Sequence, residues 1–197
     1  MGGSRDSIRP GQAAEVNRPS NPQAMANVSA RKVYDGHADL GSVVDGDTWL
    51  TPRYILDSLG RFDLDPCAAD SNPNWTRATY CWIRSDDGLM RQWKGRVFMN
   101  PPFSNTGPWI IKHARHGYGV SLVPASVESR VWRTYVWPKA KAILLLHGRT
   151  RFCNPDGSAT TGRPLRSIAL IAWSEFDAKV LSDSAFAGVL LRYWDSR

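Results

Sequence analysis

Residues 97–104 read VFMNPPFS, in which a short apolar run is followed by an asparagine, two prolines and a phenylalanine. Proline cannot donate a backbone hydrogen bond to a neighbouring strand, so the run is expected to be a strand that ends at Asn100. The polar turn then has two interpretations. It is an ordinary turn after a strand, or it is part of a site that grips a flat amino group.

Apolar segments of strand length recur on both sides of this run. We expect strands over residues 62–65, 96–99, 120–123, 142–146 and 167–173. Segments with helical patterning lie between or before them, over residues 51–60, 106–116 and 128–137. Continuous apolar strands that alternate with helices are typical of an α/β domain whose mostly parallel sheet is covered on both faces. The last two strands, joined by residues 147–166, are expected to form an antiparallel hairpin at one edge.

The N-terminal part of the chain differs from the rest in composition. Residues 1–44 are rich in Gly, Ser, Pro, Asn and Ala and have no apolar period, so we expect a flexible arm there. The first helix has a start signal in Thr51, which can cap it, and in Pro52, which suits a first turn. Gly60 can end it. One folded domain is therefore expected over residues 45–197, a length sufficient for a substantial core.

The chain carries a formal net charge of +7 and has an isoelectric point of about 9.6. Basic residues dominate from Arg91 to Arg166, whereas the acidic residues gather between Asp63 and Asp87. A surplus of this kind favours polyanionic partners, and nucleic acid first among them.

Several other classes of protein are disfavoured. No apolar run approaches the ~20 residues needed to span a membrane, and the first residues hold no apolar signal segment. The three cysteines lie far apart, which disfavours disulfides and a zinc site and favours a reducing cytoplasm. His113 and His116 are three residues apart, but no Cys or carboxylate lies beside them, so no metal site is expected.

The chemistry of the turn at Asn100 suits one type of ligand. The side-chain oxygen of Asn100 and the carbonyl oxygen of Pro101 can each accept a hydrogen bond, and Pro102 stiffens the turn that aims them. The ring of Phe103 offers a face on which a planar group can stack. Two acceptors on one exocyclic NH2 group turn its lone pair out of conjugation, which makes the nitrogen nucleophilic. The turn therefore suits a heterocycle that carries an amino group.

A second polar residue, Asp65, stands at the end of the first expected strand. Ligands of parallel sheets bind at the carboxyl ends of the strands, so Asp65 and Asn100 should open into one crevice if their strands are neighbours. The carboxylate of Asp65 can hold a ribose hydroxyl or a cationic amino group of a cofactor. Asp86 and Asp87, after another short apolar stretch, either add a contact to the cofactor or form a solvated turn.

Taken in order, these segments resemble the phage-type, Dam-like DNA N6-adenine methyltransferases. The resemblance covers about residues 47–175, and its most specific element is Asn100-Pro101-Pro102-Phe103. The shorter elements that support it are Thr51-Pro52, Asp65-Pro66-Cys67-Ala68, Asp87-Gly88-Leu89, Leu122-Val123-Pro124-Ala125 with Trp132, and the hairpin from Gly148-Arg149-Thr150-Arg151-Phe152 to Ser167.

The resemblance implies a compact Rossmann-like methyltransferase fold that uses S-adenosylmethionine, and an adenine that is flipped out of double-stranded DNA. It implies that the cofactor is held by Thr51, Pro52, Asp65, Pro66, Cys67, Ala68, Asp86 and Asp87. It implies that the catalytic residues are Asn100 and Pro101, which hold the amino group, Pro102, and Phe103, which stacks the adenine. In such enzymes the cofactor carries the reactivity, and the protein supplies orientation, acceptor dipoles and water exclusion.

The chain departs from larger methyltransferases beside its first strand. Asp65 is followed by Pro-Cys-Ala-Ala-Asp rather than by a glycine-rich loop. Only about twenty residues separate Asp65 from Asp86, and a crossover unit needs a dozen or more residues besides its strands. We therefore expect the sheet to be shortened on the side after the first strand.

No large DNA-recognition domain fits in the remaining sequence. The segment 147–166 reads HGRTRFCNPDGSATTGRPLR and combines arginines and an aromatic residue with flexible residues. Arginine binds phosphates or reads guanine edges, and an aromatic ring can wedge or stack. The candidates for DNA contact are Arg149, Arg151, Phe152, Arg163 and Arg166. The other interpretation is an ordinary exposed hairpin loop.

Two further functions are compatible with the same fold. Asn-Pro-Pro-aromatic motifs also occur in methyltransferases of RNA and of protein glutamine side chains, and a non-catalytic DNA-binding protein can retain the fold. The basic half of the chain and the arginine-rich hairpin favour nucleic acid. Cytosine-N4 enzymes more often carry serine at the position of Asn100, so adenine is the expected base. The sequence indicates neither the recognition site nor the oligomeric state.

Overall fold

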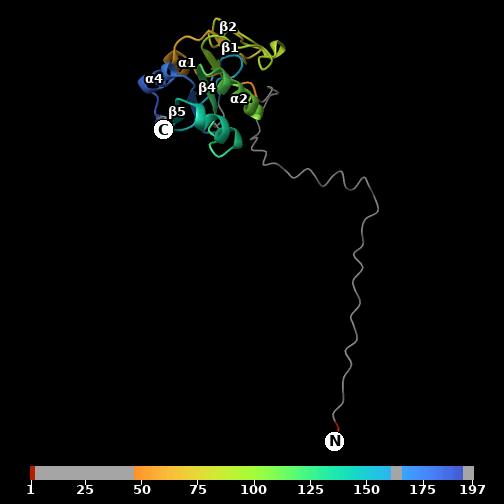
Figure 1. The fold of residues 1–197 in the computed structure, drawn as a ribbon. Helices are drawn as coiled ribbons and strands as arrows, with labels where there is room; N and C mark the ends of the chain where they lie inside the picture. Colours follow the sequence, from red (N-terminus) through yellow and green to blue (C-terminus); the bar gives the residue numbers. More distant parts are fainter. Residues whose placement is uncertain (3–46, 161–165, 193–197) are drawn as a thin grey trace, which may run out of the picture. The chain divides into compact units, whose positions relative to one another are not determined.

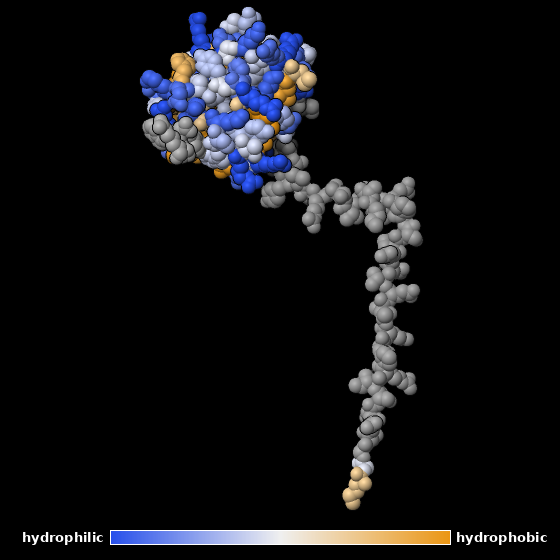
Figure 2. Space-filling view, in the orientation of Figure 1, coloured by the Kyte–Doolittle hydropathy of each residue, from blue (hydrophilic) through white to orange (hydrophobic). Residues whose placement is uncertain are grey.

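The computed structural model describes residues 1–2, 47–160 and 166–192 (Figure 1). The flexible arm expected over residues 1–44 lies outside the described residues, except for residues 1–2. Within the described ranges, no helix is both long and apolar enough to cross a membrane. Figure 2 shows one face of the molecule coloured by hydropathy. Hydrophilic residues cover most of the coloured surface of the folded domain, and the apolar patches on it are small and separate.

A seven-stranded sheet forms the centre of the fold, in the order β2-β1-β3-β4-β6-β5-β7. The parallel half consists of β2 (Tyr80–Cys81), β1 (Leu64–Asp65), β3 (Val97–Met99) and β4 (Gly119–Pro124). The antiparallel half continues from β4 with β6 (Ile168–Ala172), β5 (Ala142–Leu146) and β7 (Gly188–Arg192). The polar strand ends identified in the sequence therefore belong to the parallel half.

Helices cover both faces of this sheet. One face carries α1 (Arg53–Leu59) and α4 (Glu175–Asp183). The other face carries α2 (Thr106–His116) and the π-helical turn η4 (Trp132–Val136), which continues into α3 (Trp137–Lys139). Each face has its own core cluster of buried apolar side chains, so the domain has three layers.

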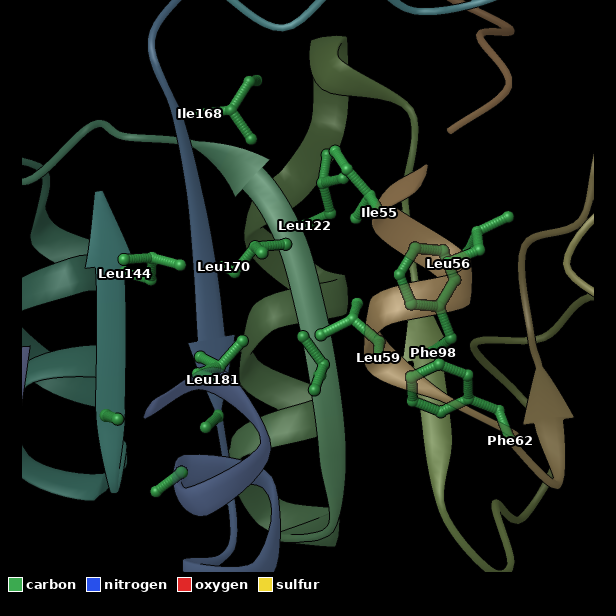
Figure 3. Packing of buried hydrophobic residues seen from close by; sticks show 14 residues of the cluster. Ile55, Leu56, Leu59, Phe62, Phe98, Leu122, Leu144, Ile168, Leu170 and Leu181 are labelled. Carbon is green, nitrogen blue, oxygen red and sulfur yellow. The ribbon is translucent and has the colours of Figure 1, made fainter. Parts of the chain in front are cut away.

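Strand β3 shows why both faces need a cover. Phe98 belongs to the core cluster that includes α1 and α4, whereas Val97 and Met99 belong to the cluster that includes α2 and η4. All three side chains are fully buried. Figure 3 shows the first cluster, in which Ile55 and Leu59 of α1 lie over the strands beside Phe98. A strand that is apolar on both sides reads as the continuous apolar run quoted above.

The expected Rossmann-like α/β fold is confirmed, as a mixed sheet with a parallel core and an antiparallel part that contains the hairpin of β5 and β6. The shortened side is confirmed as well, because among the described residues the sheet continues beyond β1 with only the two-residue strand β2. The seventh strand is β7, at the opposite edge. β7 and α4 are additions to the elements expected from the sequence, and β6 inserts between β4 and β5.

The start of α1 differs from the sequence-based prediction. The residue before the helix is Pro52, and no side chain of the described residues caps the helix there. The prediction that Thr51 caps α1 is wrong, because Pro52 itself sets the boundary and the Thr51 side chain is buried. Gly60 ends the helix as predicted, with a positive φ of 78° that suits glycine.

A buried ion pair joins the elements at the amino ends of the parallel strands. Arg96 Nε, just before β3, donates to Asp177 Oδ1 of α4 at 2.7 Å, and Asp177 is fully buried. The other oxygen of Asp177 accepts from the backbone N–H of Gly119, the first residue of β4, at 2.8 Å. Asp177 therefore ties α4 to the starts of both β3 and β4.

Arg96 extends these ties toward the first helix. Its Nη1 donates to the carbonyl oxygens of Leu59 and Arg61 at 2.9 and 2.7 Å. Its backbone N–H donates to Asp63 Oδ2 at 2.7 Å, and its guanidinium lies 4.2 Å from the centroid of the Phe62 ring. Arg96 thus holds the end of α1 and the approach to β1 against β3.

We expect Asp177→Ala to lower the free energy of unfolding by about 3–5 kcal/mol, because it leaves the Arg96 guanidinium buried without its counter-charge. Urea denaturation measures the change. Asp183→Ala is the matched control, since Asp183 forms an exposed i,i+4 pair with Lys179 that is worth only about 0.3–0.5 kcal/mol. Equal losses in the two variants would contradict a central role for the buried pair.

Candidate functional site

The polar ends of β1 and β3 meet at one edge of the sheet. The two strands pair in parallel, with Leu64 opposite Val97, so Asp65 and Asn100 leave the sheet on the same side. A cavity of about 240 Å³ lies there. Of the residues predicted for the site, those that line this cavity are Thr51, Asp65, Pro66, Cys67, Ala68, Asp87, Asn100 and Pro102. Pro52, Asp86, Pro101 and Phe103 do not line it.

Asp65 places a buried carboxyl group in the cavity wall. Its Oδ1 accepts from the backbone N–H of Cys67 at 3.1 Å, and its Oδ2 accepts from Thr76 Oγ1 at 2.9 Å. Burial raises the pKa of Asp65 to about 6, although these two hydrogen bonds act in the opposite direction. Each oxygen keeps a further lone pair, so the carboxylate can accept hydrogen bonds from a bound ligand.

Two neighbours of Asp65 complete this wall. Burial and the Asp65 carboxylate together raise the pKa of the Cys67 thiol well above its ordinary value, so the thiol is neutral. Thr51 Oγ1 is buried and has no hydrogen-bond partner among the described residues. A buried hydroxyl without a partner is unfavourable, and a polar group bound in the cavity that Thr51 lines would remove this cost.

The turn at Asp87 closes another side of the cavity. Asp87 has a left-handed backbone (φ 49°), and a Cβ atom at Gly88 would lie 2.0 Å from the carbonyl oxygen of Pro66. Only glycine therefore lets this turn approach the loop after β1. Asp86 has structural partners instead, because it accepts from the backbone N–H of Ile83 at 2.9 Å and forms an ion pair with Arg91 at 2.8 Å.

Asn100 has a defined orientation in the structure. Its Nδ2 donates to the carbonyl oxygen of Trp49 at 2.8 Å. No group of the described residues donates to its Oδ1, which stays available as an acceptor. Pro101 is buried beside it, while Pro102 lines the cavity. The turn thus presents Asn100 Oδ1 as the acceptor that the sequence suggested, while Asn100 Nδ2 is engaged by the Trp49 carbonyl oxygen.

Phe103 connects this turn to the arginine-rich hairpin. It begins the 3-10 turn η3 (Phe103–Asn105), and its ring lies 5.6 Å from that of Phe152 in an edge-to-face arrangement. Phe152 is half-buried, whereas Arg149, Arg151 and Arg166 are exposed. Arg163, the other residue predicted to contact DNA, lies outside the described residues. The hairpin therefore places an aromatic side chain at the site and arginines at the surface.

Several cavity residues were not identified from the sequence. They are Asp47, Thr48, Trp49, Leu50, Ala69, Asp70, Asn72, Trp75, Thr76, Ile83, Arg84, Gly88 and Trp109. Trp75 is the residue with the clearest signal, a large aromatic within a polar loop. Its Nε1 donates to the carbonyl oxygen of Thr51 at 2.7 Å, and Arg53 stacks over its ring at 3.9 Å. Most of the others contact the cavity through loops, which have no periodic pattern to predict.

The two histidines considered as metal ligands have structural partners instead, and only His113 is buried in the core. His113 is fully buried, its Nδ1 lies 2.8 Å from Ser121 Oγ, and burial lowers its pKa to about 3. His116 Nε2 lies 2.7 Å from the carbonyl oxygen of Gly95. In the described part of the chain, no group of three or more His, Cys, Asp or Glu side chains is arranged to hold a metal ion.

Comparison with known proteins gives one match. Residues 41–186 match the model of the family described as DNA N-6-adenine-methyltransferase (Dam). This range includes every cavity residue described above and the hairpin through Arg166. No curated protein and no solved structure matches the chain.

The raised pKa of Asp65 predicts how stability depends on pH. Because the folded-state pKa of about 6 exceeds the ordinary aspartate pKa of 3.8, the contribution of this carboxyl to stability is complete below about pH 4 and is lost as pH rises through 6. At pH 8 we expect the free energy of unfolding of Asp65→Asn to exceed that of the unsubstituted protein by about 2–3 kcal/mol. This difference should shrink toward pH 4. Urea unfolding at pH 4, 6 and 8 measures it. Asp57→Asn, at an exposed position of α1, controls for the loss of one charge. A difference independent of pH would contradict the raised pKa.

Proposed function

Because the chain belongs to the DNA N-6-adenine-methyltransferase (Dam) family, whose members are S-adenosylmethionine-dependent enzymes, we propose that the cavity at the ends of β1 and β3 is its active site. The observation that carries the proposal is the parallel pairing of these strands. It brings the buried Asp65 carboxyl and the oriented Asn100 amide to the same cavity. One strand end then serves the cofactor and the other serves the adenine.

The residues at the first strand end suit S-adenosylmethionine. Asp65 can accept from ribose hydroxyls or from the cationic amino group of the cofactor. Thr51, whose hydroxyl is buried without a partner among the described residues, can exchange a hydrogen bond with a ligand. Pro66, Cys67, Ala68 and Asp87 supply walls and backbone groups, and Pro52 and Asp86 act by shaping the flanking turns. The bound cofactor supplies the electrophilic methyl group on its sulfonium.

The residues at the second strand end suit the adenine amino group. Asn100 Oδ1 and the carbonyl oxygen of Pro101 accept hydrogen bonds from the two N–H groups of the adenine amino group. These bonds turn the nitrogen lone pair out of conjugation with the ring. Pro102 keeps these acceptors rigid. Phe103 stacks the adenine, and Phe152 supports Phe103 through the edge-to-face contact. No side chain with a high pKa is needed to activate the amino group.

An adenine inside a duplex cannot reach this turn, so we propose that the enzyme acts on double-stranded DNA and flips the base out. The exposed Arg149, Arg151 and Arg166, together with Arg163, suit contacts to phosphates and to base edges near the target. A DNA-contacting hairpin as short as this one favours a short or relaxed recognition sequence. The net charge of +7 supports the attraction to DNA.

The setting of the reaction is also a proposal. The three free cysteines support a reducing cytoplasm, that of a bacterium or of a phage-infected host cell. Methylation at short sequences is also the type of modification that protects DNA from restriction. Methylating phage DNA with the purified protein and digesting it with adenine-methylation-sensitive endonucleases tests both the product and this protection.

Asn100→Ala should abolish methyl transfer, because the variant lacks the side-chain acceptor for the amino group. The assay follows labelled methyl groups from S-adenosylmethionine to unmethylated DNA, with RNA and protein as comparison substrates. Calorimetric titration should show that the variant still binds the cofactor, and thermal unfolding should show that it is folded. Full activity of Asn100→Ala would rule out the proposed mechanism, and absence of cofactor binding by the unsubstituted protein would indicate a non-catalytic DNA-binding role.

Replacing Arg149 and Arg151 with alanine should weaken DNA binding and flatten its dependence on salt. Each lost phosphate contact lowers the slope of log K against log salt by about 0.9, so the double variant should lose up to about 2. Fluorescence anisotropy between 50 and 200 mM salt measures the slope. A charge-matched control, Lys179→Ala with Arg192→Ala, removes two exposed cations that already have ion-pair partners on α4. Equal slopes in the two double variants would exclude the hairpin from the DNA-binding surface.

A further inference from the structure

Residues 47–50 precede α1. They contact both the turn that begins at Asn100, called the catalytic turn below, and the hairpin of residues 147–166. Asp47 contacts Ser104, Trp49 contacts Asn100, and Leu50 pairs with Cys153. These contacts join residues that are more than fifty positions apart in the sequence. None of them was expected from the sequence, and together they make the segment a wall of the active site.

The contact of Trp49 with Asn100 selects one orientation of the Asn100 amide. A backbone carbonyl only accepts hydrogen bonds, so it binds the Nδ2 donor of Asn100 and not the oxygen. The two ends of an amide side chain are nearly equal in size, and packing alone separates them poorly. In the reversed orientation, oxygen would face oxygen at Trp49, and an NH2 group would face the N–H donors of the adenine. The Trp49 carbonyl therefore determines that Asn100 presents an acceptor.

Two anchors hold the Trp49 carbonyl in place, one on each side. On the N-terminal side, the Asp47 carboxylate accepts from the backbone N–H of Ser104 at 3.1 Å (Oδ1) and 3.3 Å (Oδ2), and also from Ser104 Oγ. On the C-terminal side, the Leu50 N–H donates to the Cys153 carbonyl at 3.0 Å, and the Cys153 N–H donates back at 2.9 Å. Ser104 lies directly after the catalytic turn, so Asp47 ties Trp49 to the same turn that carries Asn100.

We propose that Asp47 is a positioning residue for methyl transfer. Its bond to Ser104 fixes the Trp49 carbonyl against Asn100 Nδ2, which keeps Asn100 Oδ1 available as an acceptor for the adenine amino group. The inference rests on the proposed role of Asn100 and adds Asp47, a residue of the cavity wall whose carboxylate is engaged by Ser104. Its effect should appear in the rate of methyl transfer, not in cofactor affinity or in folding.

The test compares Asp47→Ala, Asp47→Asn and the unsubstituted protein in single-turnover methyl transfer to unmethylated DNA. Loss of one orienting interaction should lower the rate constant of Asp47→Ala about three- to tenfold. The dissociation constant of S-adenosylmethionine and the melting temperature should stay unchanged. Asp47→Asn keeps an acceptor for the Ser104 N–H and should recover most of the rate. Asp183→Ala, at an exposed carboxylate of α4, should match the unsubstituted protein.

A spectroscopic readout separates positioning from a general structural effect. In a ¹⁵N-labelled protein, the Asn100 side-chain amide is the signal that disappears in Asn100→Ala. The hydrogen bond to the Trp49 carbonyl should shift the resonance of one amide proton and protect that proton from exchange with solvent. Asp47→Ala should remove both the shift and the protection. If Asp47→Ala fails to fold, Ser104→Ala removes only the hydroxyl contact and should produce the same changes at smaller size.

The outcomes distinguish this inference from the proposed function. If Asn100→Ala is inactive while Asp47→Ala has an unchanged rate or an unchanged Asn100 amide signal, the role of Asp47 is refuted and the active site stands. A parallel loss of rate and of cofactor affinity in Asp47→Ala would also refute a positioning role. If Asn100→Ala is itself active, the proposed function fails first.

Discussion

The buried ion pair of Arg96 and Asp177 is the interaction on which the rest of the domain depends. Removing both charges from water is costly, and the cost is offset only because nearly every polar atom of the pair has a partner in the backbone or in a neighbouring side chain. These partners belong to the end of α1, the loop that follows it and the start of β4, and Arg96 itself directly precedes β3. Fixing the strands at their amino ends also fixes the positions of their carboxyl ends. Asp65 and Asn100 meet at these carboxyl ends.

The site contrasts two ways of presenting oxygen acceptors. Asp65 is a buried carboxyl with a raised pKa, so its charge depends on pH near neutrality and on what is bound beside it. Asn100 carries no charge, and its usefulness depends on which end of the amide faces the substrate. A neutral acceptor is appropriate where a neutral amino group has to be gripped without being protonated. The two strand ends therefore differ in chemistry, as their proposed roles toward a cationic cofactor and a neutral base require.

The sequence was informative where a residue's role follows from its own strand or helix. The apolar run before Asn100 identified β3, and the rule that parallel strands bind ligands at their carboxyl ends brought Asp65 and Asn100 together correctly. α2 begins and ends as predicted, since Gly117 follows it in a left-handed conformation. Residues 47–50 could not be identified in this way, because their contacts depend on pairing with distant loops. The short α4 has a weaker apolar stripe than α2, and β7 lies at an outer edge of the sheet, where it pairs with β5 among the described residues and mixes half-buried with exposed positions.

The pairing of Leu50 with Cys153 and the contact of Phe103 with Phe152 have a consequence for how the hairpin proposed to contact DNA can be changed. The hairpin does not pack independently, since its inner residues contact Phe103 and the segment before α1 that lines the cavity. Substitutions that leave these contacts intact are those of its outward side chains, such as Arg151. Exchanging the whole loop would break the Leu50–Cys153 pairing unless the segment before α1 were exchanged with it, so the two segments act as one structural unit.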